Sequence, residues 1–140
     1  MIRSAKENDI NPIYELICQL ENTEFDKGKF SKTFTQNRKD ENIYYFVAEE
    51  NSQVVGFISL IILSPLHHCD IIAEVAELVV ADNMQGIGIG KQLLQYAENK
   101  AKELMATQIE LSSNQKRVAA HRFYKIAGYG NTHFKLCKVL

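Results

Sequence analysis

The stretch Gln85-Gly86-Ile87-Gly88-Ile89-Gly90 decides how this chain is interpreted. It follows the apolar run Leu78–Val80 and precedes Lys91–Ala97, whose composition predicts a helix. A glycine-rich turn between a strand and a helix presents several backbone N–H groups at the positive end of the helix dipole. Glycine also lets the backbone approach an anion closely, because it has no Cβ. The stretch therefore predicts a binding site for a phosphate or a pyrophosphate.

Two common phosphate-binding loops do not fit this stretch. A P-loop requires G-x-x-x-x-G-K-[ST], but Gln85 replaces its first glycine and Gln92 stands where Ser or Thr would bind magnesium. A dinucleotide fingerprint requires G-x-G-x-x-G, and Lys91 occupies the place of its third glycine. The pattern that fits is [Gln/Arg]-x-x-Gly-x-[Gly/Ala], through Gln85, Gly88 and Gly90. An ordinary glycine-rich turn is the alternative interpretation.

This loop pattern resembles the acetyl-CoA pyrophosphate loop of the GNAT N-acetyltransferases. A second segment, Ala120–Tyr129, resembles the F-Y-x-x-x-G-[F/Y] signature of the same family, through Phe123, Tyr124, Gly128 and Tyr129. The resemblance implies that acetyl-CoA is the cosubstrate and that the chain is an acetyltransferase.

The composition predicts one globular domain over residues 1–140. A net charge of −1 gives no overall field that would recruit nucleic acid or a membrane. No apolar run reaches the roughly 18 residues of a membrane span, and the first residues contain no signal-peptide core. The three cysteines, Cys18, Cys69 and Cys137, form neither a disulfide framework nor a C-x-x-C pair. We therefore expect a cytoplasmic protein with free thiols.

Hydrophobic periodicity and turn residues predict the element order β-α-α-β-β-β-α-β-α-β. A half rich in hairpins precedes an α/β half, so a mixed sheet is expected. This order resembles that of the GNAT fold, which implies a mostly antiparallel central sheet flanked by about four helices. The predicted strands are Ile2–Ala5, Ile43–Glu49, Gln53–Leu63, Ile71–Val80, Gln108–Leu111 and His133–Val139. The predicted helices span about 12–20, Glu24–Arg38, Gly90–Leu104 and Lys116–Ile126.

The GNAT resemblance assigns roles to the two motifs. Backbone N–H groups from about Gln85 to Lys91 bind the pyrophosphate. The strand end at Leu78, Val79 and Val80 pairs with the pantetheine arm, and the N–H of Val79 or Val80 stabilises the oxyanion. Tyr124, next to Phe123 in the cofactor site, is the general acid for the departing thiolate. Asn114 is expected to contact the amide region of the cofactor, the alternative being a turn or helix-capping residue.

Glu74 and Glu77 are charged residues inside an otherwise apolar predicted strand. A carboxylate there is costly unless it is paired or functional. Regular alternation places the two on opposite faces, although a bulge would change this. We interpret either Glu74 or Glu77 as a general base that acts through one water. An edge position, or an ion pair with Lys or Arg, is the alternative.

His67 and His68 lie in a predicted loop. Adjacent loop histidines are usually surface residues, but imidazoles with a carboxylate also suit Ni, Co or Zn. The second interpretation is a metal or substrate site that draws on Glu74, Asp70 or the distant His133.

Several further segments resemble a narrower group, the aminoalkylphosphonate N-acetyltransferases of bacterial phosphonate-utilisation operons. The segments are Leu16-Ile17-Cys18, Glu24-Phe25-Asp26, Leu66-His67-His68, Glu77–Val80, Glu110-Leu111-Ser112, Asn114, Lys116-Arg117, Ala120–Tyr124, Gly128-Tyr129 and His133-Phe134. This resemblance implies direct acetyl transfer from acetyl-CoA to the primary amine of a small aminoalkylphosphonate, aided by a divalent metal ion. Lys116, Arg117 and Arg122 are candidate partners for the phosphonate.

Two other functions remain open at this point. One is a GNAT enzyme that acts on a polyamine, an aminoglycoside or a protein N-terminus. The other is a non-catalytic acyl-CoA-binding regulatory module. No acyl-enzyme is expected, because the three cysteines lie outside the cofactor motif. C-terminal strands of this kind often pair across subunits, so a homodimer is expected.

Overall fold

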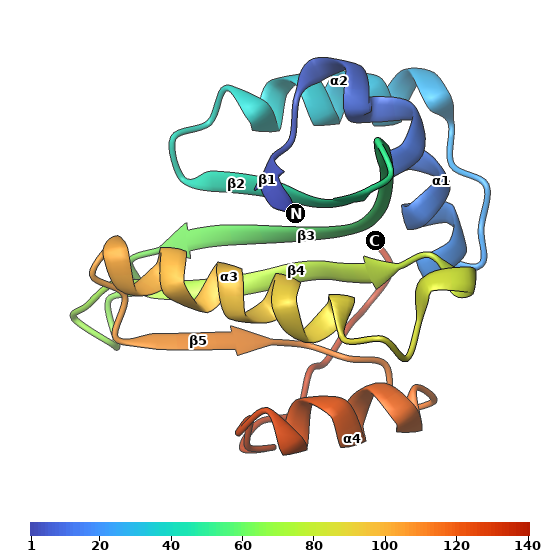
Figure 1. The fold of residues 1–140 in the computed structure, drawn as a ribbon. Helices are drawn as coiled ribbons and strands as arrows, with labels where there is room; N and C mark the ends of the chain where they lie inside the picture. The colour runs from blue at the N-terminus through green and yellow to red at the C-terminus, as the bar shows by residue number, and fades with distance from the viewer.

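A five-stranded sheet in the order β1-β2-β3-β4-β5 forms the centre of the molecule (Figure 1). The structure is a computed structural model that describes residues 1–140. Strands β1 to β4 pair antiparallel, and β5 pairs parallel with β4. The predicted mixed, mostly antiparallel sheet is therefore confirmed. The strands are β1 (Ile2–Ser4), β2 (Ile43–Glu50), β3 (Gln53–Leu63), β4 (Ile72–Val80) and β5 (Gln108–Leu111).

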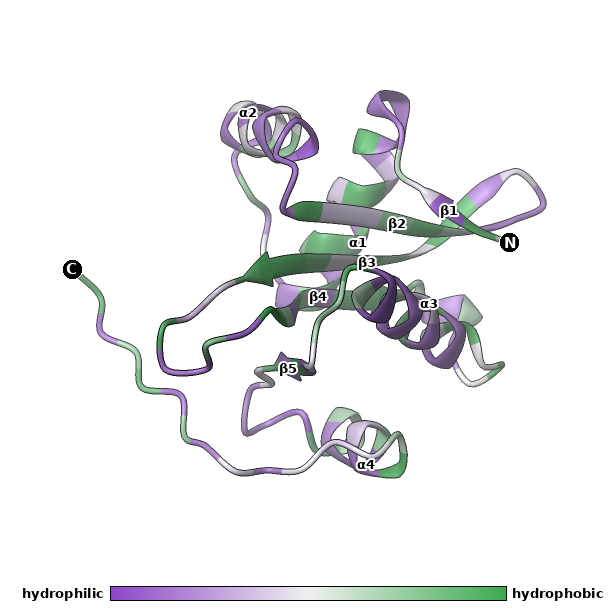
Figure 2. Cartoon of the chain, turned by 90° about the vertical axis from the view of Figure 1, so that its left-hand side faces the viewer, coloured by the Kyte–Doolittle hydropathy of each residue, from purple (hydrophilic) through white to green (hydrophobic).

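Helices cover both faces of this sheet (Figures 1 and 2). They are α1 (Ile10–Glu21), α2 (Lys27–Arg38), α3 (Ile89–Glu103) and α4 (Val118–Ile126). On one face, α1 and α2 bury Ile13, Leu16 and Phe34 against the sheet. On the other face, α3 buries Leu93 and Leu94. None of the helices has the length and apolar character needed to cross a membrane.

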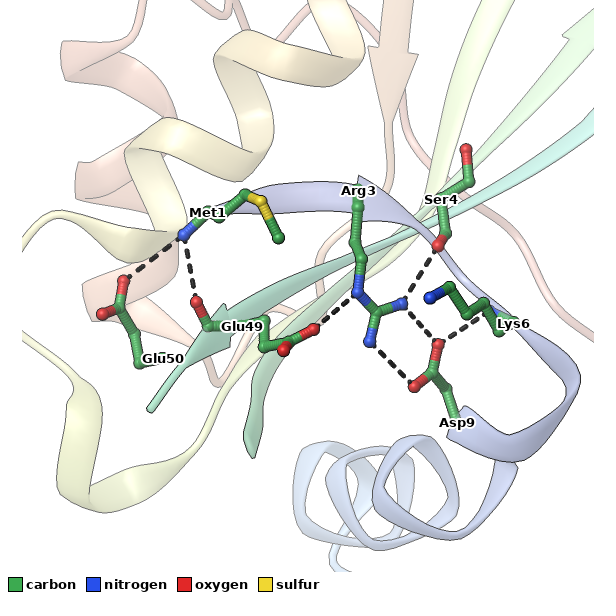
Figure 3. A network of polar contacts seen from close by, with 7 residues as sticks. All are labelled: Met1, Arg3, Ser4, Lys6, Asp9, Glu49 and Glu50. Carbon is green, nitrogen blue, oxygen red and sulfur yellow. Dashed lines mark hydrogen bonds and ion pairs between the residues drawn. The ribbon is translucent and has the colours of Figure 1, made fainter. Parts of the chain in front are cut away.

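The N-terminal strand is tied to the fold by a network of charges around Arg3 (Figure 3). The Arg3 guanidinium donates to both carboxylate oxygens of Asp9, at 2.7 and 3.1 Å, and to Oε2 of Glu49 at 2.6 Å. Asp9 also accepts the backbone N–H of Lys6 at 2.7 Å. Because Asp9 is only 6% exposed, its charge depends on these donors. The network joins β1, the short 3-10 turn Glu7–Asp9 and β2.

A β-bulge interrupts the ladder between β3 and β4 at Ala76. Ser59 lies opposite Glu77, but the next residue of β3, Leu60, lies opposite Val75. Ala76 therefore has no partner, and the alternation of side chains between the two faces is reset here. As a result, Val75 and Leu78 both belong to the apolar cluster beneath α3.

The predicted C-terminal strand His133–Val139 is wrong for this chain. Residues 130–140 have no regular secondary structure. Figure 2 shows this tail running away from the sheet after α4. A strand requires a neighbour for its hydrogen bonds, and the tail finds none within its own chain. Phe134, Leu136 and Val139 are consequently exposed.

Candidate active site

An unpaired edge of β4 is the first component of the site. β5 pairs with β4 only as far as Val75, opposite Leu111, whereas β4 continues to Val80 (Figure 1). The last residues of β4 therefore have no β5 neighbour on this side. An extended ligand can bind to such an edge as an additional strand.

The direction of the backbone groups along this edge follows from the hydrogen bonds at its end. The N–H of Ala81 donates to the Val55 carbonyl at 2.8 Å, so it points toward β3. The Val80 carbonyl points the other way and accepts from the side chains of Gln19 and Gln85, at 3.0 and 3.1 Å. Because the direction alternates along a strand, the N–H groups of Leu78 and Val80 face the open edge and that of Val79 faces β3.

The glycine-rich loop lies directly beyond this edge. Gly86 and Gly88 have φ of +81° and +92°, a region that other residues adopt only with strain. Gly88 immediately precedes α3 and accepts the Gln92 N–H at 3.0 Å, so the N–H groups of the first turn of α3 have no helical acceptor. The loop is exposed, and these free N–H groups are suited to an anion.

Tyr124 lies on α4 and packs with Phe123 against the cluster beneath α3. Its ring is 5.2 Å from that of Phe123 and 5.9 Å from that of Tyr129. Burial raises the pKa of the Tyr124 phenol, and the charge of Arg117 partly opposes this. The Tyr129 hydroxyl donates to Glu98 of α3 at 2.9 Å, whereas the Tyr124 hydroxyl makes no such bond within the chain. Tyr124 is therefore a protonated phenol that is free to donate to a ligand.

The two glutamates of β4 lie on one face, which corrects the expectation of opposite faces. Val79 belongs to the cluster beneath α1 and α2, so Glu77, two residues earlier, faces the same side. Val75 faces α3, so Glu74 faces α1 and α2 as well. The bulge at Ala76 brings about this arrangement.

Neither glutamate forms an ion pair with Lys or Arg. The pKa of Glu77 is raised by burial, lowered by a hydrogen bond from Ser59, and raised by the charges of Glu21 and Glu74. Glu77 is thus a half-buried carboxyl whose proton affinity exceeds that of a free glutamate. A carboxyl with a raised pKa is a stronger base than a free glutamate, which suits it to accept a proton from a substrate.

Comparison with known proteins agrees with this geometry. Residues 10–129 match the acetyltransferase (GNAT) family. The chain belongs to the GNAT acetyltransferase family. Membership implies acetyl-CoA as the cosubstrate, which suits a free strand edge that leads to an anion-binding loop.

The chain is similar to one characterised enzyme in sequence and to several solved structures in fold. The chain is 44% identical to the aminoalkylphosphonate N-acetyltransferase of Salmonella typhimurium over 139 residues, which cover 99% of this chain and 90% of that protein. A transcriptional regulator from Bacillus halodurans has the same fold, with a TM-score of 0.93 at 24% identity, covering 100% of this chain and 99% of that one. An acetyltransferase-like protein from Agrobacterium tumefaciens gives 0.87 at 22% identity, covering 99% of both chains.

Asn114 forms a turn beyond β5 of this GNAT fold. Its side-chain oxygen accepts the Lys116 N–H at 2.9 Å, and its carbonyl accepts from Arg117 at 3.0 Å and lies 2.8 Å from the His121 ring. Its neighbour Ser113 has a buried hydroxyl without a hydrogen-bond partner. No motif in the sequence pointed to Ser113.

The histidines do not form the metal site that was the second interpretation of His67, His68 and His133. His67 and His68 are exposed in the loop between β3 and β4, with ring centres 4.4 Å apart. His133 lies in the C-terminal tail, where its Nδ1 is 2.6 Å from Oγ1 of Thr132. No group of three or more His, Cys, Asp or Glu side chains gathers in a way that could hold a metal ion. These residues therefore do not fit a bound metal.

Proposed function

We propose that this GNAT enzyme transfers the acetyl group of acetyl-CoA directly to the primary amine of a small aminoalkylphosphonate. The observation that carries the proposal is 44% identity, over nearly the whole chain, to an enzyme of that name. The open edge of β4 and the glycine-rich loop beside it support the acetyl-CoA half of the reaction.

The cosubstrate is held mainly by backbone groups in this proposal. N–H groups from Gln85 to Lys91 bind the diphosphate at the start of α3. The pantetheine arm extends along Leu78, Val79 and Val80 as an added strand. The N–H groups of Leu78 and Val80 are the candidate oxyanion donors, because they face the open edge.

The acyl transfer requires the substrate nitrogen to lose two protons and the CoA thiolate to gain one. Glu77 takes a proton from the substrate ammonium through one water, which frees the nitrogen lone pair to attack the thioester carbonyl. The C–N bond forms, the C–S bond breaks, and the CoA thiolate takes the proton of the Tyr124 hydroxyl. The nitrogen loses its second proton as the amide forms, and this proton restores the Tyr124 hydroxyl through solvent. The raised pKa of Tyr124 keeps this proton in place at neutral pH. Glu74 lies on the same face and is the alternative base.

The phosphonate end of the substrate requires a cationic partner. Arg117 is our candidate among Lys116, Arg117 and Arg122, because its charge already acts on Tyr124. All three side chains are exposed at the start of α4 or along it, and none of them forms an ion pair.

The decisive experiment is a CoA-release assay with matched amines. Aminomethylphosphonate and glycine differ only in the anionic group, and putrescine and an aminoglycoside represent other acceptor classes. We expect the highest kcat/KM for the phosphonate. A phosphonate that is no better than its carboxylate analogue would contradict the proposed substrate. Binding of acetyl-CoA without acetylation of any amine would favour a regulatory module.

We also propose that the protein is a homodimer held together by its C-terminal tail. Phe134, Leu136 and Val139 are 88%, 92% and 97% exposed, which is costly for apolar side chains in a monomer. β5 ends the sheet, so one of its edges has no strand beside it. In a dimer, the tail of each copy can pair with the free β5 edge of the other copy, which also covers the apolar side chains of the tail.

Sedimentation analysis tests the dimer. We expect a dimer for residues 1–140 and a folded monomer for a chain that ends at Gly130. A full-length monomer, in which the tail covers its own sheet edge, would contradict the proposal.

A further inference from the structure

A single buried hydroxyl contacts both the main chain and the side chain of Glu77. Ser59 lies in the middle of β3 and is 1% exposed. Its Oγ accepts the backbone N–H of Glu77 at 3.0 Å. The same hydroxyl donates to Oε2 of the Glu77 carboxylate.

This contact coincides with the bulge of β4. In an uninterrupted antiparallel ladder, the Glu77 N–H would donate to a backbone carbonyl of β3. Here it donates to a side-chain oxygen, and the pairing shifts by one residue immediately afterwards. The hydroxyl therefore binds the main chain of β4 at the point where the strand is re-aimed.

We propose that Ser59 is the positioning residue for Glu77. It fixes Oε2 on the face of the sheet beneath α1 and α2, and it leaves Oε1 free for the water that carries the substrate proton. The inference rests on the proposed role of Glu77 as the base. Removal of the hydroxyl takes a hydrogen-bond donor from the half-buried carboxylate and an acceptor from the N–H of the same residue.

The surroundings of Glu77 contain no cation that could replace Ser59. Glu74 of β4 and Glu21 of α1 act on Glu77 with like charge. Tyr45 of β2, opposite Ser59, is partly buried, and burial and the charge of Glu77 both raise the pKa of its phenol. Its hydroxyl accepts from Asn37 of α2 at 2.7 Å. Ser59 is thus the hydrogen-bond donor that stabilises the ionised form of Glu77.

Three substitutions separate positioning from a general loss of structure. Ser59→Ala removes the donor, Ser59→Thr keeps a hydroxyl on a strand-favouring residue, and Ser59→Cys provides a weaker donor of similar size. We expect the kcat of Ser59→Ala to fall by about tenfold or more, with acetyl-CoA binding within about twofold of the wild type.

The pH profile is the readout that a purely structural role would not change. Since Ser59 lowers the pKa of Glu77 and the base must be ionised, loss of the donor moves the acid limb of kcat/KM to higher pH. Ser59→Thr should keep the wild-type limb, and Ser59→Cys should lie between. If Ser59→Ala does not fold, the acid limb of the kcat/KM profile of Ser59→Cys tests the positioning role instead. The pKa of Glu77, followed by carboxyl-carbon NMR in the absence of substrate, should shift in the same order.

Glu77→Gln distinguishes failure of the base from failure of Ser59. If Glu77→Gln keeps wild-type activity, the proposed base is wrong and the role of Ser59 is lost with it. If Glu77→Gln is inactive but the serine variants keep the wild-type acid limb and kcat, the base remains and the positioning role is overturned.

Discussion

At the scale of single residues, Tyr124 and Tyr129 form a natural pair of test and control. The two rings are 5.9 Å apart, but only the Tyr129 hydroxyl is engaged, by Glu98. We expect Tyr124→Phe to lower kcat by about 10²-fold, because the thiolate loses its proton donor. Its acetyl-CoA affinity should remain nearly unchanged.

Tyr129→Phe should behave in the opposite way. It loses a hydrogen bond to a carboxylate and should lower the free energy of unfolding by about 1 kcal/mol while keeping most of kcat. Steady-state kinetics and urea denaturation of both variants check this. Equal activity of Tyr124→Phe and wild type would exclude Tyr124 as the acid.

At the scale of the elements, the glycine-rich segment Gln85–Gly90 should tolerate an added methyl group at Gly90 and not at Gly88. Gly88 has a φ of +92°, so Gly88→Ala is strained by about 1–2 kcal/mol. Gly90 lies within α3, and an added Cβ would be 3.7 Å from Val80 and 3.8 Å from Phe123, which is ordinary contact. Gly90→Ala should therefore not lower stability.

Thermal unfolding measures the stability of the glycine variants, and calorimetry measures their affinity for CoA. We expect Gly88→Ala to lower both stability and CoA affinity, because its strain displaces the N–H groups that bind the diphosphate. CoA affinity at the wild-type level in Gly88→Ala would place the diphosphate elsewhere.

The elements also show which features of the fold and the site could be predicted from the sequence. The strand, glycine loop and helix from Leu78 to Ala97 are local, and residue type alone predicts them. The shared face of Glu74 and Glu77 depends on a bulge, which a period-two pattern cannot reveal. Ser59 looks like any polar residue within a strand, because its role arises only from the register of β3 against β4.

At the scale of the whole molecule, the sequence-based predictions that are wrong concern contacts between distant parts of the chain. The sequence predicts a strand over His133–Val139, but a strand requires a neighbouring strand, and this chain supplies none. The predicted metal site fails for the same reason. His67 and His68 lie in the loop between β3 and β4, whereas His133 lies in the unpaired tail. Sequence patterns report local geometry, whereas pairing and metal ligation depend on what the fold brings together.

The charge network around Arg3 joins β1 to β2, and it makes the free energy of unfolding depend on pH (Figure 3). The hydrogen bonds from Arg3 hold the pKa of Asp9 below its usual range, against the effect of burial. Its contribution to stability is complete above the pKa of an unfolded aspartate, about 3.9, and is lost as the pH falls through the lower folded value.

Asp9→Asn should therefore lower the free energy of unfolding by about 2 kcal/mol at pH 7, since the three hydrogen bonds that Asp9 accepts from Arg3 and Lys6 lose the charge of the carboxylate. The difference from wild type should shrink as the pH falls below about 3.9, because the wild-type carboxyl then also becomes neutral. Glu7→Gln, an exposed neighbour without such partners, should change stability little at either pH. Urea denaturation at both pH values measures these differences. A loss that is equal at neutral and acidic pH would mean that Asp9 stabilises the fold through its shape and not through its charge.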